Sequence, residues 1–316
     1  MYVSAPLKAF AVTLSAVVLT HAVVGPGKVT GDTAVHDPTM CKDNTGKYWA
    51  FSTGTGLDIR TSTDRTAWTR VGVVWPNGAP WTDAYTNTTN GVLWAPDCTY
   101  ANGEFNLYYA ASTFGSQKVG VSTVYSVWQK VSVFTGSWTN YGLVTSTAKG
   151  NNYNMRANSQ FIDNGDLYLS LGSFWTGIKE LSSSTGKPTS GTVTSIAQRT
   201  ANSGAIEASV IYKYGPYYYL FTSWDLCCKG TSSTYNIRVG RSSSVKGPFA
   251  DKSNVPLMNG GGTLVLGTHD SIIGPGGQDL FTDSDGPILV YHYYTSTGSN
   301  LGINRLDFSS GWPVVI

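Results

Sequence analysis

The sequence contains few charged residues, and its positive charges are not clustered. Of its 316 residues, 13% are Asp, Glu, Lys or Arg, and the formal net charge is +2. A protein that binds nucleic acid or an anionic membrane by electrostatic attraction normally carries a clustered basic patch. We therefore expect neither nucleic acid nor a membrane as a partner.

Long helical patterns are also missing. No segment shows apolar residues at helical spacing for more than a turn or two, and no heptad repeat occurs. The chain instead has 36 Gly, 19 Tyr and 13% aromatic residues, in short alternating segments separated by Gly, Asn and Asp. This composition predicts an all-β protein.

The chain has only four cysteines, and their spacing does not match a metal site. Cys227 and Cys228 are adjacent, so their Cα atoms are about 3.8 Å apart, below the usual range for a disulfide. Whether they form a vicinal bridge stays open. Cys41 and Cys98 could be a pair or buried free thiols; because they lie on expected strands rather than in loops, we expect free thiols.

The one long apolar run lies at the N-terminus. Lys8 precedes the apolar segment 9–19, and Thr20-His21-Ala22 resembles a cleavage site. These features predict a signal peptide over residues 1–22, followed by a single domain over residues 23–316. The run is too short to span a bilayer, so we expect a secreted, extracellular monomer. Asn87 begins the one N-glycosylation sequon.

Five stretches of the domain share one layout. In each, a residue near the start of one strand stands eleven positions before the middle of an aromatic or aliphatic strand. A repeat of about 50–70 residues with several short strands is typical of a β-propeller blade. The sequence therefore predicts a five-bladed β-propeller, with its fifth blade beginning near Thr263. Its inner strands should bring five key positions to the axis: Asp37, Asp97, Ala157, Glu207 and Gln278.

Two of the three acids at these positions, Asp37 and Glu207, suggest a chemistry. Asp37 and Glu207 belong to blades that are not neighbours, so they can face each other across the axis. The sequence shows no Ser/His pair, metal-ligand cluster or Gly-rich phosphate loop. A carboxylate that deprotonates water and a carboxylic acid that protonates the leaving oxygen are the requirements of inverting glycoside hydrolysis. The alternative is that each acid only caps a strand.

Five motifs stand in the order seen in glycoside hydrolase family 43. They are His36-Asp37-Pro38, Leu93-Trp94-Ala95-Pro96-Asp97, Ser112-Thr113-Phe114-Gly115-Ser116, Gly172-Ser173-Phe174-Trp175 and Gly274-Pro275-Gly276-Gly277-Gln278. The chain resembles the fungal endo-1,5-α-L-arabinanases of that family, including the Cys227-Cys228 pair. The resemblance implies a five-bladed propeller that cleaves arabinan, a side chain of pectin, with inversion. It also implies that Asp37 is the general base and Glu207 the general acid.

The chain departs from this family at a third acid, which keeps the general acid protonated and orients it. Family members carry Asn-Ala-Ile-Asp in this strand, whereas this chain reads Asn154-Met155-Arg156-Ala157. Asn158 should point to the opposite face, and so should Arg156 unless the strand bulges, because side chains alternate along a strand. Without the neighbouring charge, we expect Glu207 to hold its proton less well. The enzyme should then be slower, more dependent on acidic pH, or inactive.

The resemblance further implies a surface for the polysaccharide and one ion. Substrate contacts are expected from Asp37, Trp94, Phe114, Gly115, Asn154, Ser173, Phe174 and Trp175, although the aromatic residues among them equally fit packing between blades. In the family, a histidine holds a hydrated calcium or similar ion in the central channel. His269 is the candidate here, and no other cofactor is expected; a single histidine is more often structural.

Two alternative functions stay open. One is an exo-acting α-L-arabinofuranosidase or β-xylosidase of the same family. The other is a catalytically inactive propeller that binds arabinan, an alternative that Ala157 motivates.

Overall fold

The computed structural model describes residues 25–86, 88–111, 122–130, 138–147 and 154–316. For residues 122–130, 147 and 154–158 it describes the backbone alone. The predicted signal peptide (residues 1–22), Asn87, Phe114 and Gly115 lie outside the described residues. Almost all of the regular structure is β-strand, which confirms the all-β prediction. Among the described residues, no helix is long and apolar enough to cross a membrane.

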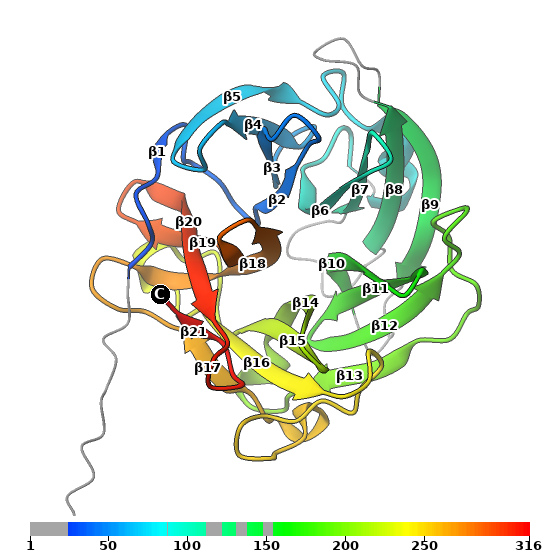
Figure 1. Cartoon of the computed structure of the whole chain (residues 1–316). Coiled ribbons are helices and arrows are strands. Elements are labelled where there is room, and N and C mark those ends of the chain that lie inside the picture. Colours follow the sequence, from blue (N-terminus) through cyan, green and yellow to red (C-terminus); the bar gives the residue numbers. More distant parts are fainter. Residues whose placement is uncertain (1–24, 87, 112–121, 131–137, 148–153) are drawn as a thin grey trace, which may run out of the picture.

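The described strands form five sheets, which we number in chain order and which surround a central axis (Figure 1). Sheet 1 has the order β1-β5-β4-β3-β2, and the other sheets follow the order of the chain. Sheet 1 contains β1 (Thr30–Gly31), β2 (Thr39–Lys42), β3 (Tyr48–Ser52), β4 (Asp58–Ser62) and β5 (Ala67–Val73). Sheet 2 contains β6 (Leu93–Ala101), β7 (Glu104–Ala111), β8 (Ser122–Lys130) and β9 (Thr139–Thr147).

The remaining sheets are built in the same way. Sheet 3 contains β10 (Asn154–Asp163), β11 (Asp166–Ser173), β12 (Trp175–Leu181) and β13 (Thr194–Gln198). Sheet 4 contains β14 (Ile206–Tyr214), β15 (Tyr217–Trp224), β16 (Asn236–Ser242) and β17 (Thr263–Leu266). Sheet 5 contains β18 (Ile273–Asp283), β19 (Gly286–Thr295), β20 (Gly298–Asp307) and β21 (Val314–Val315). The short helices are η1 (Pro80–Thr82), α1 (Asp83–Thr86), η2 (Asn202–Gly204), η3 (Gly230–Ser232) and η4 (Leu257–Asn259).

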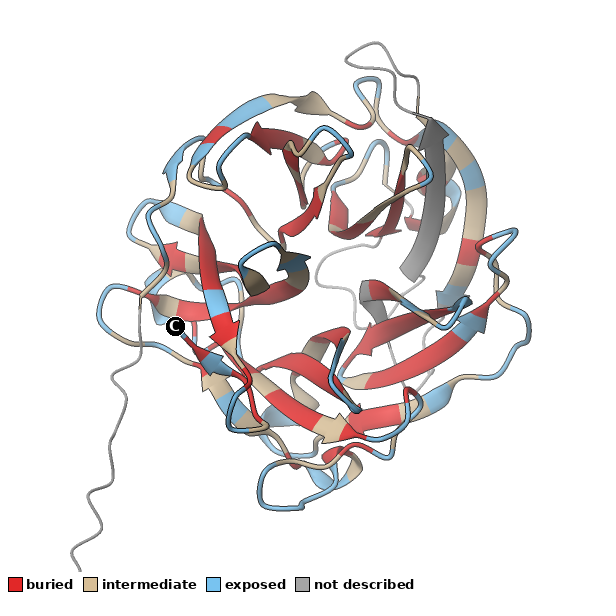
Figure 2. Ribbon diagram, viewed as in Figure 1, coloured by how far each residue is buried: buried red, intermediate tan, exposed pale blue. Residues whose placement is uncertain are grey.

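The innermost strands form a continuous ring. Each of β2, β6, β10, β14 and β18 contacts the innermost strand of the next sheet, and β18 contacts β2. Many strand residues near the centre are buried, whereas the outer strand β5 is mostly half-buried or exposed (Figure 2). Aromatic and aliphatic residues fill the space between neighbouring sheets, for example Phe51 against Phe105 between sheets 1 and 2. This arrangement leaves the first residues of the inner strands free to line the axis.

Short turns join the first two strands of several sheets. Asn102-Gly103 and Asn164-Gly165 are the two-residue loops of the β6–β7 and β10–β11 hairpins. All four residues have positive φ, between 51° and 95°, which Asn and Gly adopt more readily than other residues. The Asn-Gly pairs therefore confirm the hairpins predicted there.

Sheet 4 is longer than the sequence predicted. Thr263–Leu266 forms β17, which pairs with β16 as the outer strand of sheet 4. The prediction that the fifth blade begins near Thr263 is therefore wrong, because sheet 5 begins at Ile273. A long connection that contains η4 joins β16 to β17. Because of its length, the sequence pattern assigned β17 to the following blade.

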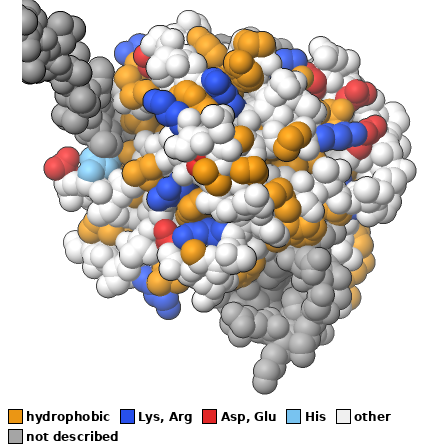
Figure 3. Space-filling model, turned by 90° about the horizontal axis from the view of Figure 1, so that it is seen from below, with side chains coloured by type: hydrophobic (Ala, Val, Ile, Leu, Met, Phe, Trp, Pro, Cys, Tyr) orange, Lys and Arg blue, Asp and Glu red, His pale blue; other side chains and the backbone are white. Residues whose placement is uncertain are grey.

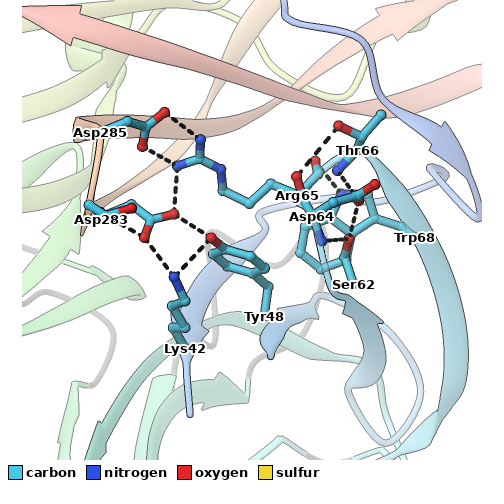
Figure 4. A network of polar contacts seen from close by, with 10 residues as sticks. Lys42, Tyr48, Ser62, Asp64, Arg65, Thr66, Trp68, Asp283 and Asp285 are labelled. Atoms are coloured by element: carbon cyan, nitrogen blue, oxygen red, sulfur yellow. Dashed lines mark hydrogen bonds and ion pairs between the residues drawn. The ribbon is translucent and has the colours of Figure 1, made fainter. Parts of the chain in front are cut away.

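The N-terminal segment joins the first and last sheets. β1 pairs with β5 of sheet 1, and the N–H of Leu301 in β20 donates to the carbonyl of Thr33 at 2.8 Å. Figure 4 shows a polar network across the same junction, in which Arg65 and Lys42 of sheet 1 contact Asp283 of sheet 5 at 2.7 and 2.8 Å. Burial acts to raise the pKa of Asp283, but hydrogen bonds from Lys42 and Tyr48 outweigh it and lower the pKa to about 2. The network therefore favours a charged Asp283 and closes the ring.

Both cysteine pairs are disulfides. Cys41 in β2 and Cys98 in β6 are bridged, with Cα atoms 6.0 Å apart, so the prediction of free thiols there is wrong. The two residues lie on neighbouring inner strands, and that spatial proximity is not visible in a sequence separation of 57. Cys227 and Cys228 form the vicinal bridge that the sequence left open, with Cα atoms 3.8 Å apart.

The surface carries charges of both signs. On the face shown in Figure 3, Lys and Arg side chains are interspersed with Asp and Glu and with apolar side chains. This view agrees with the small net charge of +2.

Candidate active site

Four inner strands are interrupted by bulges close to the axis. The pairing register shifts between Trp94 and Asp97 in β6, between Glu207 and Val210 in β14, and between Gly276 and Asp279 in β18. In β10 it shifts between Asn154 and Asn158. Bulges re-aim side chains and are common beside active sites.

The bulged region contains a repeated backbone conformation. Left-handed φ values of 47°, 42°, 51° and 56° occur at Asp37, Ala95, Ala208 and Gly277. Each of these residues stands six positions before a residue at the start of its hairpin turn: Asp43, Ala101, Tyr214 and Asp283. The same count from Asp163 gives Ala157. The structural repeat is therefore Asp37, Ala95, Ala157, Ala208 and Gly277.

The predicted key positions match this repeat only in part. Asp37 and Ala157 are members of it, whereas Asp97 lies two residues after Ala95, Glu207 one residue before Ala208 and Gln278 one residue after Gly277. The predicted alignment of the repeats is wrong by one or two residues, because a run such as Tyr217-Tyr218-Tyr219 does not show which tyrosine is equivalent to a given residue of another repeat. The slip has a consequence: Asp37 and Glu207 are not equivalent in the repeat, and their side chains leave the inner strands at different points.

Asp37 and Glu207 nevertheless line one cavity. This cleft cavity has a volume of about 350 Å³, and the described residues that line it include His36, Trp94 and Tyr235. A second space of about 280 Å³, which we call the side cavity, adjoins it: Glu207 and Cys227 line both. Glu207 therefore stands between two spaces, either of which can hold part of a ligand.

Asp37 is held by contacts on its carboxylate oxygen Oδ2 and on its backbone N–H. Thr53 Oγ1 donates to Asp37 Oδ2 at 3.0 Å, and His36 Nε2 lies 3.6 Å from the same oxygen. The backbone N–H of Asp37 donates to His292 Nδ1 at 3.1 Å. Because that nitrogen accepts, it carries no proton, and His292 Nε2 is the protonated atom that faces Tyr294 Oη at 3.0 Å.

The neutral state of His292 follows from its environment. Burial, and then the neighbouring His36, hold the pKa of His292 well below its usual value of 6.5. A Cβ on Gly277 would collide with Asp37 Oδ1 and with the His292 ring. Glycine at position 277 therefore permits the close approach of Asp37 and His292 to this strand.

Glu207 accepts one hydrogen bond on each carboxylate oxygen. Ser173 Oγ donates to Oε2 and Tyr235 Oη donates to Oε1, both at 2.8 Å. Burial, then the charges of Glu207 and Asp37, raise the pKa of Tyr235 well above 10, so Tyr235 remains a neutral donor. These two hydroxyls fix the orientation of the Glu207 carboxyl group.

The predicted aromatic contacts are divided between the two cavities. Trp94 is buried and lines the cleft cavity. Phe174 is 42% exposed, has a left-handed φ of 65° and lines the side cavity. Trp175 is half-buried at the start of β12 and lies in the described lining of neither cavity.

The predicted residues of β10 are described only by their backbone. Asn154 pairs with Ser173, and Ala157 lies inside the bulge that follows. From Asn154 to Asn158 is four steps, whereas the paired residues Ser173 and Leu171 are two steps apart. Side chains therefore do not alternate regularly between the two faces in this segment. The prediction that Arg156 and Asn158 point to the opposite face assumed regular alternation, which the bulge interrupts.

Two further acids lie deeper along the axis. Asp97 Oδ2 accepts the N–H of Gln160 in sheet 3 at 2.9 Å, and Asp279 Oδ2 accepts the N–H of Met40 in sheet 1 at 3.0 Å. Burial raises the pKa of both carboxyls, to about 8 for Asp97, where the charge of Asp279 adds to the effect, and to about 6 for Asp279. Each acid therefore joins its own sheet to the next one, at the cost of being withdrawn from water.

His269, the predicted ion ligand, lies outside the described lining of the axial cavity. This cavity, of about 30 Å³ and lined by residues that include Asp37, Asp97, Gln278 and Asp279, runs beside the deep acids. At roughly 10–15 Å³ per water, this volume suits two or three waters. His269 lies in the turn before β18; Nδ1 is 2.9 Å from the Gly267 carbonyl, and the buried Nε2 has no hydrogen-bond partner among the described residues.

Among the described residues, a different group of side chains could hold a metal ion. Ligand atoms of His36, Asp37 and His292 lie within 4.8 Å of one another. Both ring nitrogens of His292 are, however, engaged with Asp37 and Tyr294. A metal ligated by His292 would have to replace one of these contacts.

Sequence reasoning missed several residues of the site. Tyr235, His292 and Thr53 contact the two acids, and the Cys227–Cys228 bridge lines the cleft cavity. Alternation along Tyr291-His292-Tyr293 could have placed His292 on the inner face of its strand. Tyr235 and Thr53 follow or precede loops, where no periodic signal exists.

Comparison with known proteins identifies the family. Residues 27–313 match the profile of Glycosyl hydrolases family 43. The chain is 37% identical to the "Probable arabinan endo-1,5-alpha-L-arabinosidase A" of Aspergillus terreus, over 99% of this chain and 98% of that one.

Solved structures agree with this similarity. The GH43 endo-arabinanase from Bacillus licheniformis superposes with a TM-score of 0.84 at 39% identity, over 91% of this chain and 99% of that one. An exo-1,5-alpha-L-arabinanase from a bovine ruminal metagenomic library superposes with a TM-score of 0.84 at 32% identity, over 92% of this chain and 100% of that one. Profile, sequence and structure together show that the chain belongs to glycosyl hydrolases family 43, as its motifs predicted.

Proposed function

We propose that the chain is a secreted, five-bladed β-propeller enzyme that hydrolyses internal α-1,5-arabinofuranosyl linkages of arabinan. The observation that carries the proposal is the position of Glu207 between two adjoining cavities, one of which it shares with Asp37. Sugar units bound in both cavities would place a glycosidic bond beside Glu207. The endo-acting names of the relatives from Aspergillus terreus and Bacillus licheniformis support this substrate.

The proposed mechanism is a single displacement with inversion. Asp37 takes a proton from a water molecule that attacks the anomeric carbon, and Glu207 gives its proton to the leaving oxygen. Thr53 holds Asp37 by a hydrogen bond to its carboxylate, and His292 holds it by accepting its backbone N–H. Ser173 and Tyr235 orient the Glu207 carboxyl towards the cleft.

Products separate this proposal from the exo-acting alternative. Linear α-1,5-arabinan is incubated with the enzyme, and the products are sized by anion-exchange chromatography from the first minutes of reaction. Early oligosaccharides of mixed length support endo action. Monosaccharide, or one short product alone from the start, indicates exo action, the activity named for the enzyme from the ruminal metagenomic library. Proton NMR of the newly formed reducing ends tests inversion.

A catalytically inactive arabinan-binding propeller is the second candidate. Ala157 favours it, because Ala157 occupies the place in the repeat that Asp37 occupies in sheet 1, and it offers no carboxylate. An isothermal titration that detects binding of α-1,5-arabinohexaose, with no reducing ends released at any pH from 4 to 8, would select this candidate.

The calcium ion implied by the resemblance stays a prediction. No step of the mechanism passes through it. If a structural ion is bound, chelation and dialysis should lower the Tm, and calcium should restore it. Elemental analysis showing less than one equivalent of metal, with an unchanged Tm, would leave His269 as a structural residue.

A further inference from the structure

The Cys227–Cys228 bridge lies on the substrate-facing surface. It belongs to the loop between β15 and β16, Cys228 is exposed, and both residues line the cleft cavity. Cys228 Sγ is 3.7 Å from His36 Nε2, and that nitrogen is 3.6 Å from Asp37 Oδ2. On its other side Cys227 also lines the side cavity, together with Glu207. The bridge therefore lies beside Asp37 in the cleft cavity, and its Cys227 shares with Glu207 the boundary between the two cavities.

Chain stabilisation does not explain this bridge. A disulfide restricts the unfolded chain more as the loop it closes grows longer, and this one joins residues with a separation of one. The loop is also held without it, because Leu226 and Thr234 exchange hydrogen bonds and Lys229 N–H donates to Ser233 Oγ at 3.0 Å. The bridge therefore adds little to the stability of the loop that carries it.

The bridge does create a rigid apolar surface. Two free cysteines or serines would rotate about χ1, but a ring formed by adjacent residues cannot, so it loses no rotamer entropy when a ligand binds. Sulfur is polarisable and packs well against apolar groups. Val92 and Trp94 line the same cavity. A pentose with C–H groups on one face fits such an apolar surface better than a charged or planar ligand does.

Hydrogen bonds connect the position of this surface to that of the base. The N–H of Cys228 donates to Tyr294 Oη at 2.9 Å, and the same oxygen contacts His292 Nε2. His292 Nδ1 in turn accepts the N–H of Asp37. A sugar resting on the bridge is therefore positioned relative to Asp37 through three buried or half-buried contacts.

We propose that the Cys227–Cys228 disulfide is a substrate-positioning surface on which an arabinofuranosyl unit of the chain rests beside Asp37 and Glu207. The proposal depends on the proposed function for the identity of the sugar. It makes the bridge a determinant of substrate affinity, unlike Cys41–Cys98, which is buried and joins two sheets.

Two double variants test the proposal by a crossed comparison. Cys227→Ala/Cys228→Ala should raise the KM for linear α-1,5-arabinan roughly five- to tenfold, as loss of one apolar contact surface predicts, and should lower kcat less, with little change in Tm. Cys41→Ala/Cys98→Ala should lower the Tm by roughly 10 °C and leave KM unchanged. Titration with α-1,5-arabinohexaose should show the same loss of affinity only in the first variant.

Each other outcome decides against the proposal or against the function. An unchanged KM in Cys227→Ala/Cys228→Ala, or a variant that fails to fold or melts as early as the Cys41/Cys98 variant, would overturn the positioning role. If the wild type binds the hexasaccharide without cleaving it, hydrolysis fails, and the Kd comparison still tests the bridge. If the wild type neither binds nor cleaves, both proposals fail.

Discussion

Two layers of acids lie along the axis, and they differ in what surrounds them. Asp37 and Glu207 line the cleft cavity and accept hydrogen bonds from side-chain hydroxyls. Asp97 and Asp279 lie deeper and are buried, and each accepts a backbone N–H group from the next sheet; Asp279 also accepts the hydroxyl of Thr39. The difference shows that an acid near an inner strand faces a cavity or joins two sheets according to its distance from the hairpin turn.

The bulges create this difference. Asp97 and Asp279 lie on the turn side of the register shifts in β6 and β18, and Glu207 lies on the far side of the shift in β14. One inserted residue turns the strand and moves the following side chains to another level. The mouth layer (Asp37 and Glu207) is thereby open to a ligand, and the deep layer (Asp97 and Asp279) holds neighbouring sheets together.

The largest expected effect concerns the place in the mouth layer that lacks an acid. Ala157→Asp should restore a carboxylate near the general acid and raise the rate on linear arabinan by a factor between about 10² and 10⁴, the range of general acid catalysis. A nearby like charge also favours the protonated acid, so the basic limb of the pH–rate profile should move upward. Initial rates from pH 4 to 8 measure both.

Ala157→Asn is the matched control for that substitution. It supplies nearly the same shape without the charge, so it should restore little of the rate. Equal gains from Asn and Asp, or no gain from either beside a fast wild type, would show that Ala157 does not hold the place of the third acid.

A smaller effect is expected from the contacts that orient Glu207. Tyr235→Phe removes the hydroxyl that donates to Oε1; a hydrogen bond to a charged group contributes about 1.5–3 kcal/mol, so kcat/KM should fall roughly 10-fold or more. Since the lost bond favours the charged carboxylate, the basic limb should move to higher pH. Tyr214→Phe, at an exposed tyrosine, should change neither quantity, and an unmoved profile in Tyr235→Phe would limit Tyr235 to packing.

The deep layer should affect stability instead of rate. The folded-state pKa values of about 8 for Asp97 and about 6 for Asp279 exceed the value of about 3.9 for an unfolded Asp. The folded chain therefore holds these protons more tightly, and stability should fall as pH rises from about 4 to 8. Asp97→Asn should remove part of this fall and stabilise the protein at pH 8 by an amount on the order of 2 kcal/mol.

Thermal melts at pH 5 and pH 8 measure this effect. Asp166→Asn, at an exposed hairpin position, should leave the pH dependence as it is in the wild type. A wild-type Tm that rises between pH 5 and 8, or an Asp97→Asn variant whose Tm depends on pH as the wild type's does, would contradict the raised pKa of Asp97.

The sequence predicted the all-β class, the hairpins at Asn102-Gly103 and Asn164-Gly165, and the family. It identified Asp37 and Ala157 correctly as members of the repeat. It misplaced Asp97, Glu207 and Gln278 by one or two residues, because a bulge leaves no mark in the composition of a strand. Nor could it predict the Cys41–Cys98 bridge or the contact of Tyr235 with Glu207, which join segments far apart in the chain.

The assignment of chemistry to the mouth layer is tested most directly by the release of reducing ends from linear α-1,5-arabinan. Wild type, Glu207→Gln and Asp97→Asn are compared at the pH optimum of the wild type, with hexasaccharide binding measured in parallel. The account predicts cleavage by the wild type and by Asp97→Asn, and a rate at least about 10²-fold lower in Glu207→Gln with binding retained. Cleavage by Glu207→Gln at the wild-type rate would contradict it.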